Sequence, residues 1–200
     1  QNDVQLTEEE KRINKNKREM EEKGYQVSPG IPWRRYFARC FDAQIGVAAI
    51  AALLSVMIYS ITKDLMLLND SIWFICVVAY VLYIFIEALI IKLTGTTFGK
   101  FTMGITVVTS SYDRNYTYSQ LLRRGFLVFL KGLGLNIPIV NIITLLLSKS
   151  YVNQDESGQA SWDFDCSTLV AYRQFTLVNY ILIIVNIIIS FSLIVANAVI

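Results

Sequence analysis

The chain has 200 residues, of which 54% are hydrophobic and only 17% are charged, with 18 Lys and Arg against 16 Asp and Glu. It contains no histidine, which excludes imidazole metal ligands, Ser-His or Cys-His catalysis and a histidine proton switch. The three cysteines, Cys40, Cys76 and Cys166, lack the CxxC spacing of a metal site. We therefore expect no metal and no cofactor, and we do not expect an enzyme.

Residues 1–30 are predicted to form a charged cytoplasmic arm, made of an amphipathic helix and a linker. Thr7 and Glu10 have the spacing of a capping box, which marks the start of a helix. The mixed charges that follow supply ion pairs one helical turn apart. Pro29 and Pro32 end the arm, because proline cannot continue a helix. We expect the arm to be solvated, and a docking helix is the alternative.

Four apolar segments follow, and they predict an all-α integral membrane protein with about four transmembrane helices. Residues 43–61 and 72–91 are each long enough to cross a hydrocarbon layer of about 30 Å. Residues 126–147 are interrupted by a lysine, two glycines, an asparagine and Pro138, so this segment is either a kinked span or a re-entrant pair of half-helices. Residues 175–200 form an uncharged final span.

The basic residues predict the orientation of these spans. Nine Lys and Arg precede the first span, one lies in the first loop, and five lie in residues 92–125. Because loops rich in Lys and Arg stay in the cytoplasm, the N-terminus and this second loop are expected there, in a multi-pass protein of the bacterial cytoplasmic membrane. The side that holds residues 148–174 depends on the interrupted segment and stays open.

The second loop carries two short β-prone pieces and a conspicuous lysine. Residues 105–109 and 116–118 are separated by a polar turn, which predicts a small cytoplasmic β-hairpin. Lys100 follows a glycine-containing stretch that lacks the spacing of a phosphate-binding loop. We expect Lys100 to contact lipid headgroup phosphates.

Three motifs resemble those of the RDD family of small polytopic membrane proteins. They are Arg35-x-x-Ala38-x-x-x-Asp42, Glu87 followed by Gly99-Lys100, and Trp162-Asp163. Arg123, or its neighbour Arg124, falls where that family carries another arginine. The resemblance covers residues 31–172 and implies an RDD-like membrane domain, with 175–200 as an additional terminal helix. Some members of the family are implicated in cation/proton antiport, and others resemble accessory parts of larger membrane assemblies.

Several charged residues are candidates for a site. Arg35, Arg39 and Asp42 have helical spacing that places them on one face. Glu87 lies one turn before the cytoplasmic end of the second span, at a depth similar to that of Asp42. Carboxylates at such depth face the bundle interior and pair with a cation, so they predict either a cation or proton site or a structural ion-pair lock. The full candidate set is Arg35, Arg39, Asp42, Glu87 and, through the resemblance, Arg123 and Asp163.

The final span carries a polar stripe on one helical face. Its members are Asn179, Asn186, Ser190 and Asn197. Side-chain amides within a span bond neighbouring helices, so we interpret this stripe as a packing surface.

Two functions follow from these patterns. The first is transport of a monovalent cation or proton, for which carboxylates paired with arginines supply the site. The second is a non-catalytic membrane subunit or adaptor of a larger complex. Four spans are few for a lone transporter, so transport needs a homo-oligomer or further helices after Ile200. The expected partners are membrane lipids and a second copy or another membrane protein, and no nucleic acid.

Overall fold

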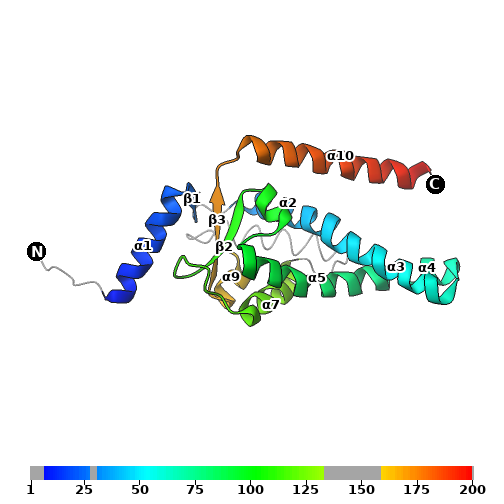
Figure 1. The fold of residues 1–200 in the computed structure, drawn as a ribbon, viewed down its shortest axis with the longest axis horizontal. Coiled ribbons are helices and arrows are strands. Elements are labelled where there is room, and N and C mark those ends of the chain that lie inside the picture. Colours follow the sequence, from blue (N-terminus) through cyan, green and yellow to red (C-terminus); the bar gives the residue numbers. More distant parts are fainter. Residues whose placement is uncertain (1–6, 28–30, 133–158, 200) are drawn as a thin grey trace, which may run out of the picture.

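The computed structural model describes residues 7–27, 31–132 and 159–199 of the chain. A charged helix lies at one end, a small sheet follows in the middle, and long apolar helices extend away from the sheet toward the other end (Figure 1). The fold is thus mostly helical, as expected, with a sheet between its charged and apolar parts.

The N-terminal helix α1 (Glu8–Glu22) begins with the predicted capping box. The backbone N–H of Glu10 donates to the Thr7 hydroxyl, and the Glu10 carboxylate accepts from the Thr7 backbone N–H at 2.8 Å. None of its side chains is buried, and the Asn16 amide donates to the backbone carbonyl of Ser111 at 3.0 Å. Helix α1 is therefore solvated over most of its surface, while the bond from Asn16 joins it to the loop that contains Ser111.

The first long helix is continuous from Pro32 to Thr62. It consists of α2 (Pro32–Asp42), the π-helical turn η1 (Ala43–Val47) and α3 (Ala48–Thr62). No residue of α3 is buried, and apolar side chains such as Leu53 and Ile61 are 67% and 80% exposed. A run of exposed apolar side chains this long is stable among lipid tails and unfavourable in water.

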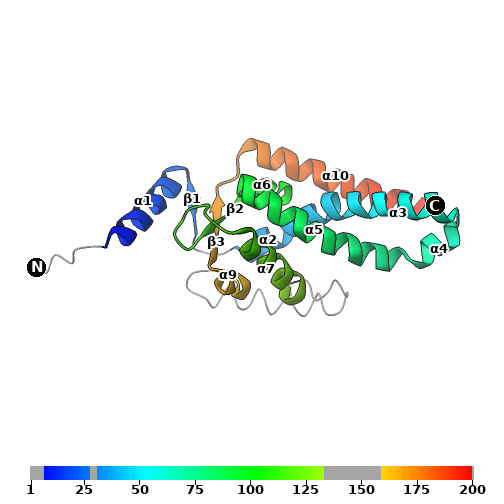
Figure 2. The ribbon, with the colours of Figure 1, turned by 60° about the horizontal axis from the view of Figure 1, so that its bottom comes forward.

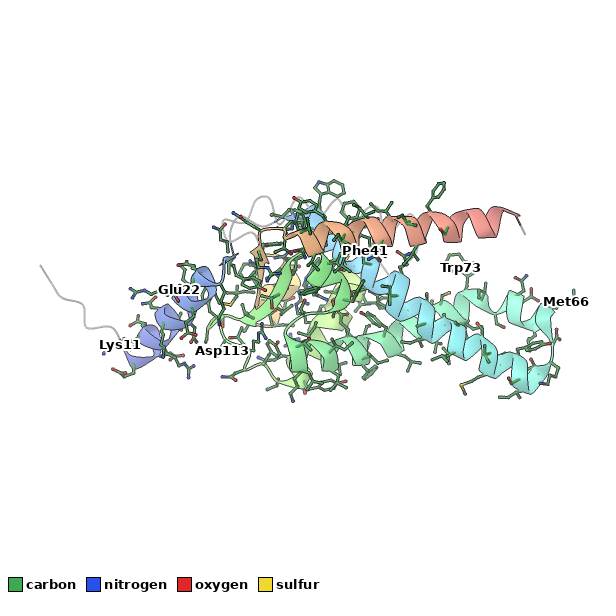
Figure 3. The ribbon with its side chains drawn as sticks, turned by 45° about the horizontal axis from the view of Figure 1, so that its top comes forward. Lys11, Glu22, Phe41, Met66, Trp73 and Asp113 are labelled. Atoms are coloured by element: carbon green, nitrogen blue, oxygen red, sulfur yellow. The ribbon has the colours of Figure 1, made fainter. Side chains whose placement is uncertain are left out.

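The second long helix, α5 (Ile72–Thr94), packs against the first. The short helix α4 (Leu65–Asp70) connects them and is capped by the Asp64 carboxylate, which accepts from two backbone N–H groups. Trp73 lies near this connection, far from the sheet and from Asp113 (Figure 3). The two helices contain the predicted spans 43–61 and 72–91, and both are long and apolar enough to cross a membrane.

The three strands form one antiparallel sheet in the order β1-β3-β2. They are β1 (Tyr25–Gln26), β2 (Ile105–Thr109) and β3 (Thr168–Arg173). Ile105 pairs with Tyr172, and Thr109 pairs with Thr168, so all five residues of β2 pair with β3. Between the sheet and α2 lies an apolar core, formed by Ala38, Phe41, Met103, Ile105, Val170 and Tyr172.

The predicted hairpin between residues 105–109 and 116–118 is wrong. The partner of β2 is β3, which comes much later in the chain. Tyr116 is instead buried, and its hydroxyl donates to the Ile91 carbonyl at 2.7 Å, while Tyr118 begins α7 (Tyr118–Leu127). Burial of the Tyr116 ring with a satisfied hydroxyl outweighs the β-propensity of these residues.

The interrupted segment 126–147 is described only in part. It begins within α7 and continues into the π-helical turn η2 (Val128–Gly132). Residues 133–147, and with them the choice between a kinked and a re-entrant arrangement, lie outside the described residues. Helix α9 (Ser161–Asp165), after the gap, packs beside α7 (Figure 2). The described chain on both sides of the gap therefore lies at the sheet end of the molecule.

The last helix, α10 (Leu177–Val199), starts beside α6 (Phe98–Thr102) and extends in the same direction as the two long helices (Figures 1 and 2). Its exposed side chains include Leu177 at 77% and Phe191 at 67%. Its apolar surface resembles that of the two candidate spans.

Candidate functional site

Asp42 is buried where α2 meets the first turn of α6. One of its carboxylate oxygens accepts from the Thr97 hydroxyl at 2.6 Å, and the other accepts from the backbone N–H of Gly99 at 2.7 Å. Thr97 also caps α6, because its side chain accepts a hydrogen bond from the Lys100 backbone N–H. The start of α6 is thus bonded to the end of α2 through one carboxylate.

The Lys100 ammonium lies among three side-chain oxygens. Its Nζ is 2.5 Å from Glu87 Oε1, 3.2 Å from Thr97 Oγ1 and 3.5 Å from Asp42 Oδ2. Lys100 is only 6% exposed. We call Asp42, Glu87 and Lys100 the Lys100 triad. Because one ammonium serves two carboxylates, the triad has a formal charge of −1.

The expected contact of Lys100 with lipid phosphates is therefore wrong. Helix α6 is only one turn long, and its cap at Thr97 directs Lys100 inward, toward the acids. The buried carboxylate of Asp42 and the partly buried carboxylate of Glu87 need a cation nearby, and this demand outweighs the attraction of Lys100 to the membrane surface. The partner of Asp42 and Glu87 also differs from the prediction. The sequence predicts arginines, and the structure places Lys100 there.

Asp163 forms a second cluster with two arginines. Its carboxylate is 2.5 Å from Arg35 Nη1 and accepts from Arg124 Nε and Nη2 at 3.0 and 2.9 Å. We call Arg35, Arg124 and Asp163 the Asp163 cluster; it joins α2, α7 and α9. Burial alone would raise the pKa of the Asp163 carboxyl, but the charges of Arg124 and Arg35 hold that pKa below its ordinary value.

Arg35 also binds two residues that the sequence did not single out. Its Nη2 donates to Gln159 Oε1 at 2.9 Å, and its Nε donates to the Tyr172 hydroxyl at 2.5 Å. Gln159 is fully buried and accepts from the Val170 backbone N–H at 2.9 Å. Gln159 lies three residues before Trp162 of the Trp-Asp motif, and that proximity is the only sign of its role in the sequence. Through these bonds Arg35 connects α2 to the central strand β3.

The arginine of α7 in this cluster is Arg124, and the candidate Arg123 is exposed. Helix α7 has Thr117 as its N-cap, which forms a capping box with Gln120. Leu121 and Arg124 of α7 and Val128, the first residue of η2, are buried, and their spacing places them on one helical face. Arg123 falls on another face. Counting helical positions from the capping box would have selected Arg124.

Arg39 shares a helical face with Arg35 but does not join either cluster. Its guanidinium lies 4.8 Å from the centroid of the Trp162 ring, a distance typical of a cation–π contact. Among the described residues, no carboxylate lies within salt-bridge distance of Arg39.

A small cavity connects the two clusters. Its lining includes Arg35, Ala38, Arg39, Glu87, Lys100 and Arg124. The cavity volume is about 20 Å³, which is enough for roughly one water molecule. Five of the six charged residues predicted for the site therefore line or adjoin this cavity. The sixth, Arg123, faces away from it.

The polar stripe of α10 is described for two of its four members. Asn179 is fully buried, and its Nδ2 donates to the backbone carbonyls of Phe101 and Thr102 at 2.8 and 3.1 Å. Asn186 is also buried and donates to the Leu182 carbonyl of its own helix at 2.9 Å. The side chains of Ser190 and Asn197 lie outside the described residues. Asn179 therefore supplies the described polar link between α10 and α6.

Within residues 7–27, 31–132 and 159–199, no three Cys, Asp or Glu side chains gather in the way a metal site requires. No curated protein and no solved structure matches the chain. The RDD family matches residues 29–198, which include both charge clusters and also α10, a helix we expected to lie beyond the family domain. This match covers most of the sequence, and two apolar helices of spanning length accompany it. The chain belongs to the RDD family and is a membrane protein.

Proposed function

We propose that this protein exchanges protons for a monovalent cation across the membrane, and that the Lys100 triad is the exchange site. The observation that carries this proposal is the position of the Lys100 ammonium, which occupies a cation position between two carboxylates. The oxygens of Asp42, Glu87 and Thr97 that surround it are ligands that also suit sodium or potassium.

The presence of a lysine in the triad supports cation/proton exchange over a purely structural ion pair. An arginine would stay charged at every accessible pH, whereas a buried lysine can give up its proton and its flexible stem can withdraw. In the proposed step, Na⁺ or K⁺ binds the carboxylates as Lys100 releases one proton to water. One positive charge leaves the triad and one enters, so its formal charge of −1 is conserved.

The location of the triad is compatible with access from one side. Asp42 and Glu87 lie toward the sheet ends of the two long helices, and Glu87 also lines the cavity. We place this end and the N-terminus in the cytoplasm, because the basic residues concentrate there. The described helices do not enclose a path by themselves, so we propose that a homo-oligomer completes it.

The second candidate is a non-catalytic membrane subunit, in which the charge clusters only hold the fold together. The observation that favours it is the small cavity, which leaves little space for an additional ion. The Asp163 cluster fits such a role, because two arginines that never deprotonate hold its carboxylate. The exposed arm α1 would then supply a binding surface for a larger partner.

A flux measurement separates the two functions. Purified protein is reconstituted into liposomes that contain a pH-sensitive dye, and a sodium or potassium gradient is imposed. Exchange predicts a pH change with the wild-type protein and its loss in Lys100→Arg, which keeps the charge but not the releasable proton. Asp165→Asn, which removes an exposed ion pair with Lys131, is the matched control and should retain flux. If wild-type liposomes show no pH change, the exchange proposal fails; stoichiometric co-purification of a larger membrane protein, lost on deletion of residues 1–24, would then establish the subunit role.

A further inference from the structure

A groove that contains no member of the two charge clusters lies where α2 and α10 begin. Its volume is about 590 Å³, and its lining includes Ile31, Arg34, Tyr172, Arg173, Phe175 and Thr176. No member of the Lys100 triad lines it.

Two arginines give this groove a strong positive charge. Among the described residues that line it there is no aspartate or glutamate, so Arg34 and Arg173 are not neutralised there. The Nε atoms of both arginines are buried and have no hydrogen-bond partner in the described part of the chain. Because these Nε atoms are closed to solvent, a ligand in the groove would meet the other guanidinium nitrogens, and the positive charge there favours an anionic group that accepts hydrogen bonds.

Both guanidinium groups are held in place by neutral contacts. Arg34 Nη2 donates to the Arg173 backbone carbonyl at 2.8 Å, and the Arg34 guanidinium lies 4.0 Å from the centroid of the Phe175 ring. The Arg173 guanidinium lies 5.7 Å from the centroid of the Tyr25 ring. These contacts position the arginines and leave their charge available, which is the arrangement that recognises phosphate groups.

The surroundings of the groove indicate which phosphate it meets. The long helix that begins at Pro32 and α10 both leave this region toward the apolar end of the molecule (Figure 1). Trp33 is 50% exposed beside Arg34, and Leu177 and Tyr180 are 77% and 55% exposed at the start of α10. Exposed aromatic side chains at the ends of apolar helices are typical of the membrane interface, where lipid headgroups lie.

We propose that this groove binds the headgroup phosphate of an anionic phospholipid. Arg34 and Arg173 contact the phosphate, and the acyl chains lie along the exposed apolar side chains that begin with Trp33 and Leu177. The site does not depend on cation exchange at Lys100, so it can be tested separately.

The test measures binding and thermal stability in a neutral detergent. Short-chain phosphatidylglycerol should raise the unfolding temperature of the wild-type protein, whereas phosphatidylcholine and inorganic phosphate should not. Arg34→Gln and Arg173→Gln should each weaken phosphatidylglycerol binding by about tenfold, the loss expected for one charge-assisted contact. Arg123→Gln, which removes an exposed arginine outside the groove, is the matched control.

Three results would overturn the proposal. Equal stabilisation by the two lipids would show that the headgroup charge is not recognised. Equal stabilisation by inorganic phosphate would show a site for the free ion and not for a lipid. Unchanged binding in both Arg34→Gln and Arg173→Gln would place the lipid elsewhere; because these are two separate variants, misfolding of one leaves the other to decide.

Discussion

Gly99 packs against the backbone of Ala38 so closely that a Cβ atom on residue 99 would overlap the Ala38 carbonyl oxygen. The same approach brings the Gly99 N–H to the Asp42 carboxylate. The contact between α6 and α2, and with it the inward position of Lys100, therefore requires glycine at residue 99.

Gly99→Ala should destabilise the protein severely. The added methyl group meets rigid backbone, so the helices must separate, and overpacking of this kind costs about 3 kcal/mol. Gly24→Ala is the control: its Cβ would meet nothing within 4 Å, and its left-handed backbone costs only about 1 kcal/mol. Denaturant unfolding in detergent gives both values, and equal losses would contradict the close packing of Gly99.

Asp163→Asn should be far more harmful than Asp165→Asn. The first change leaves Arg35 and Arg124 buried without their carboxylate, and breaking a buried ion pair costs about 3–5 kcal/mol. Asp165 pairs with Lys131 at the surface, where a pair contributes about 1 kcal/mol or less. The two unfolding free energies should differ clearly; a similar small loss in both variants would remove the structural role of the Asp163 cluster.

The stability of the protein should fall in acid below about pH 4 because of Asp163. Burial raises the pKa of this carboxyl, but the neighbouring charges of Arg124 and Arg35 lower it more, so its folded-state pKa lies below its unfolded-state value. Such a group stabilises the fold above its unfolded-state pKa of about 4, and this contribution is lost as the pH falls through the folded-state pKa. Unfolding temperatures measured from neutral to acid pH should therefore drop below about pH 4. Asp163→Asn should show a smaller drop, and an identical pH profile would exclude this carboxyl as the cause.

Asn179→Ala should loosen the start of α10. The change removes one of the two donors described for the Phe101 carbonyl and the donor described for the Thr102 carbonyl. An unsatisfied buried carbonyl costs about 1–3 kcal/mol. Hydrogen–deuterium exchange should rise in residues 177–183. Ser192→Ala, which removes only an exposed bond to the Ile188 carbonyl, should leave exchange there unchanged. Unchanged exchange in Asn179→Ala would show that apolar packing alone holds the helix.

The orientation can be tested with introduced cysteines in a chain whose three native cysteines are replaced. Ser110 and Asp64 are both exposed and lie at opposite ends of the long helices. With the sheet in the cytoplasm, Asp64→Cys should react with a membrane-impermeant maleimide in intact cells, and Ser110→Cys should react only after lysis. The reverse pattern would invert the proposed topology.

The sequence predicted those parts of the fold that depend on neighbouring residues. The capping box at Thr7 and the helices over 43–61 and 72–91 follow from local spacing and composition, and all are present. The strand partner of β2 could not be found this way, because pairing with β3 brings together segments far apart in the chain. Short β-prone pieces specify where a strand can form but not which strand lies beside it.

The candidate site shows the same division. Asp42 and Glu87 were found because an acid in an apolar segment is conspicuous, whereas the partner lysine was assigned to the membrane surface. The inward position of Lys100 depends on Thr97 capping a helix of one turn, which no periodic pattern marks. Arg124 was recoverable, since its helical register follows from the capping box at Thr117.

The late position of β3 in the chain has a consequence for biosynthesis. Arg35 leaves the ribosome long before Gln159, Asp163 and Tyr172, the residues that accept its hydrogen bonds. The first long helices therefore reach the translocon before the hydrogen-bond acceptors of Arg35 have been synthesised. At that stage β2 is unpaired, because β3 has not yet been made. Chains truncated before residue 173 should therefore be degraded by membrane proteases. They cannot complete the sheet or pair Arg35, and partly folded chains of this kind are unstable.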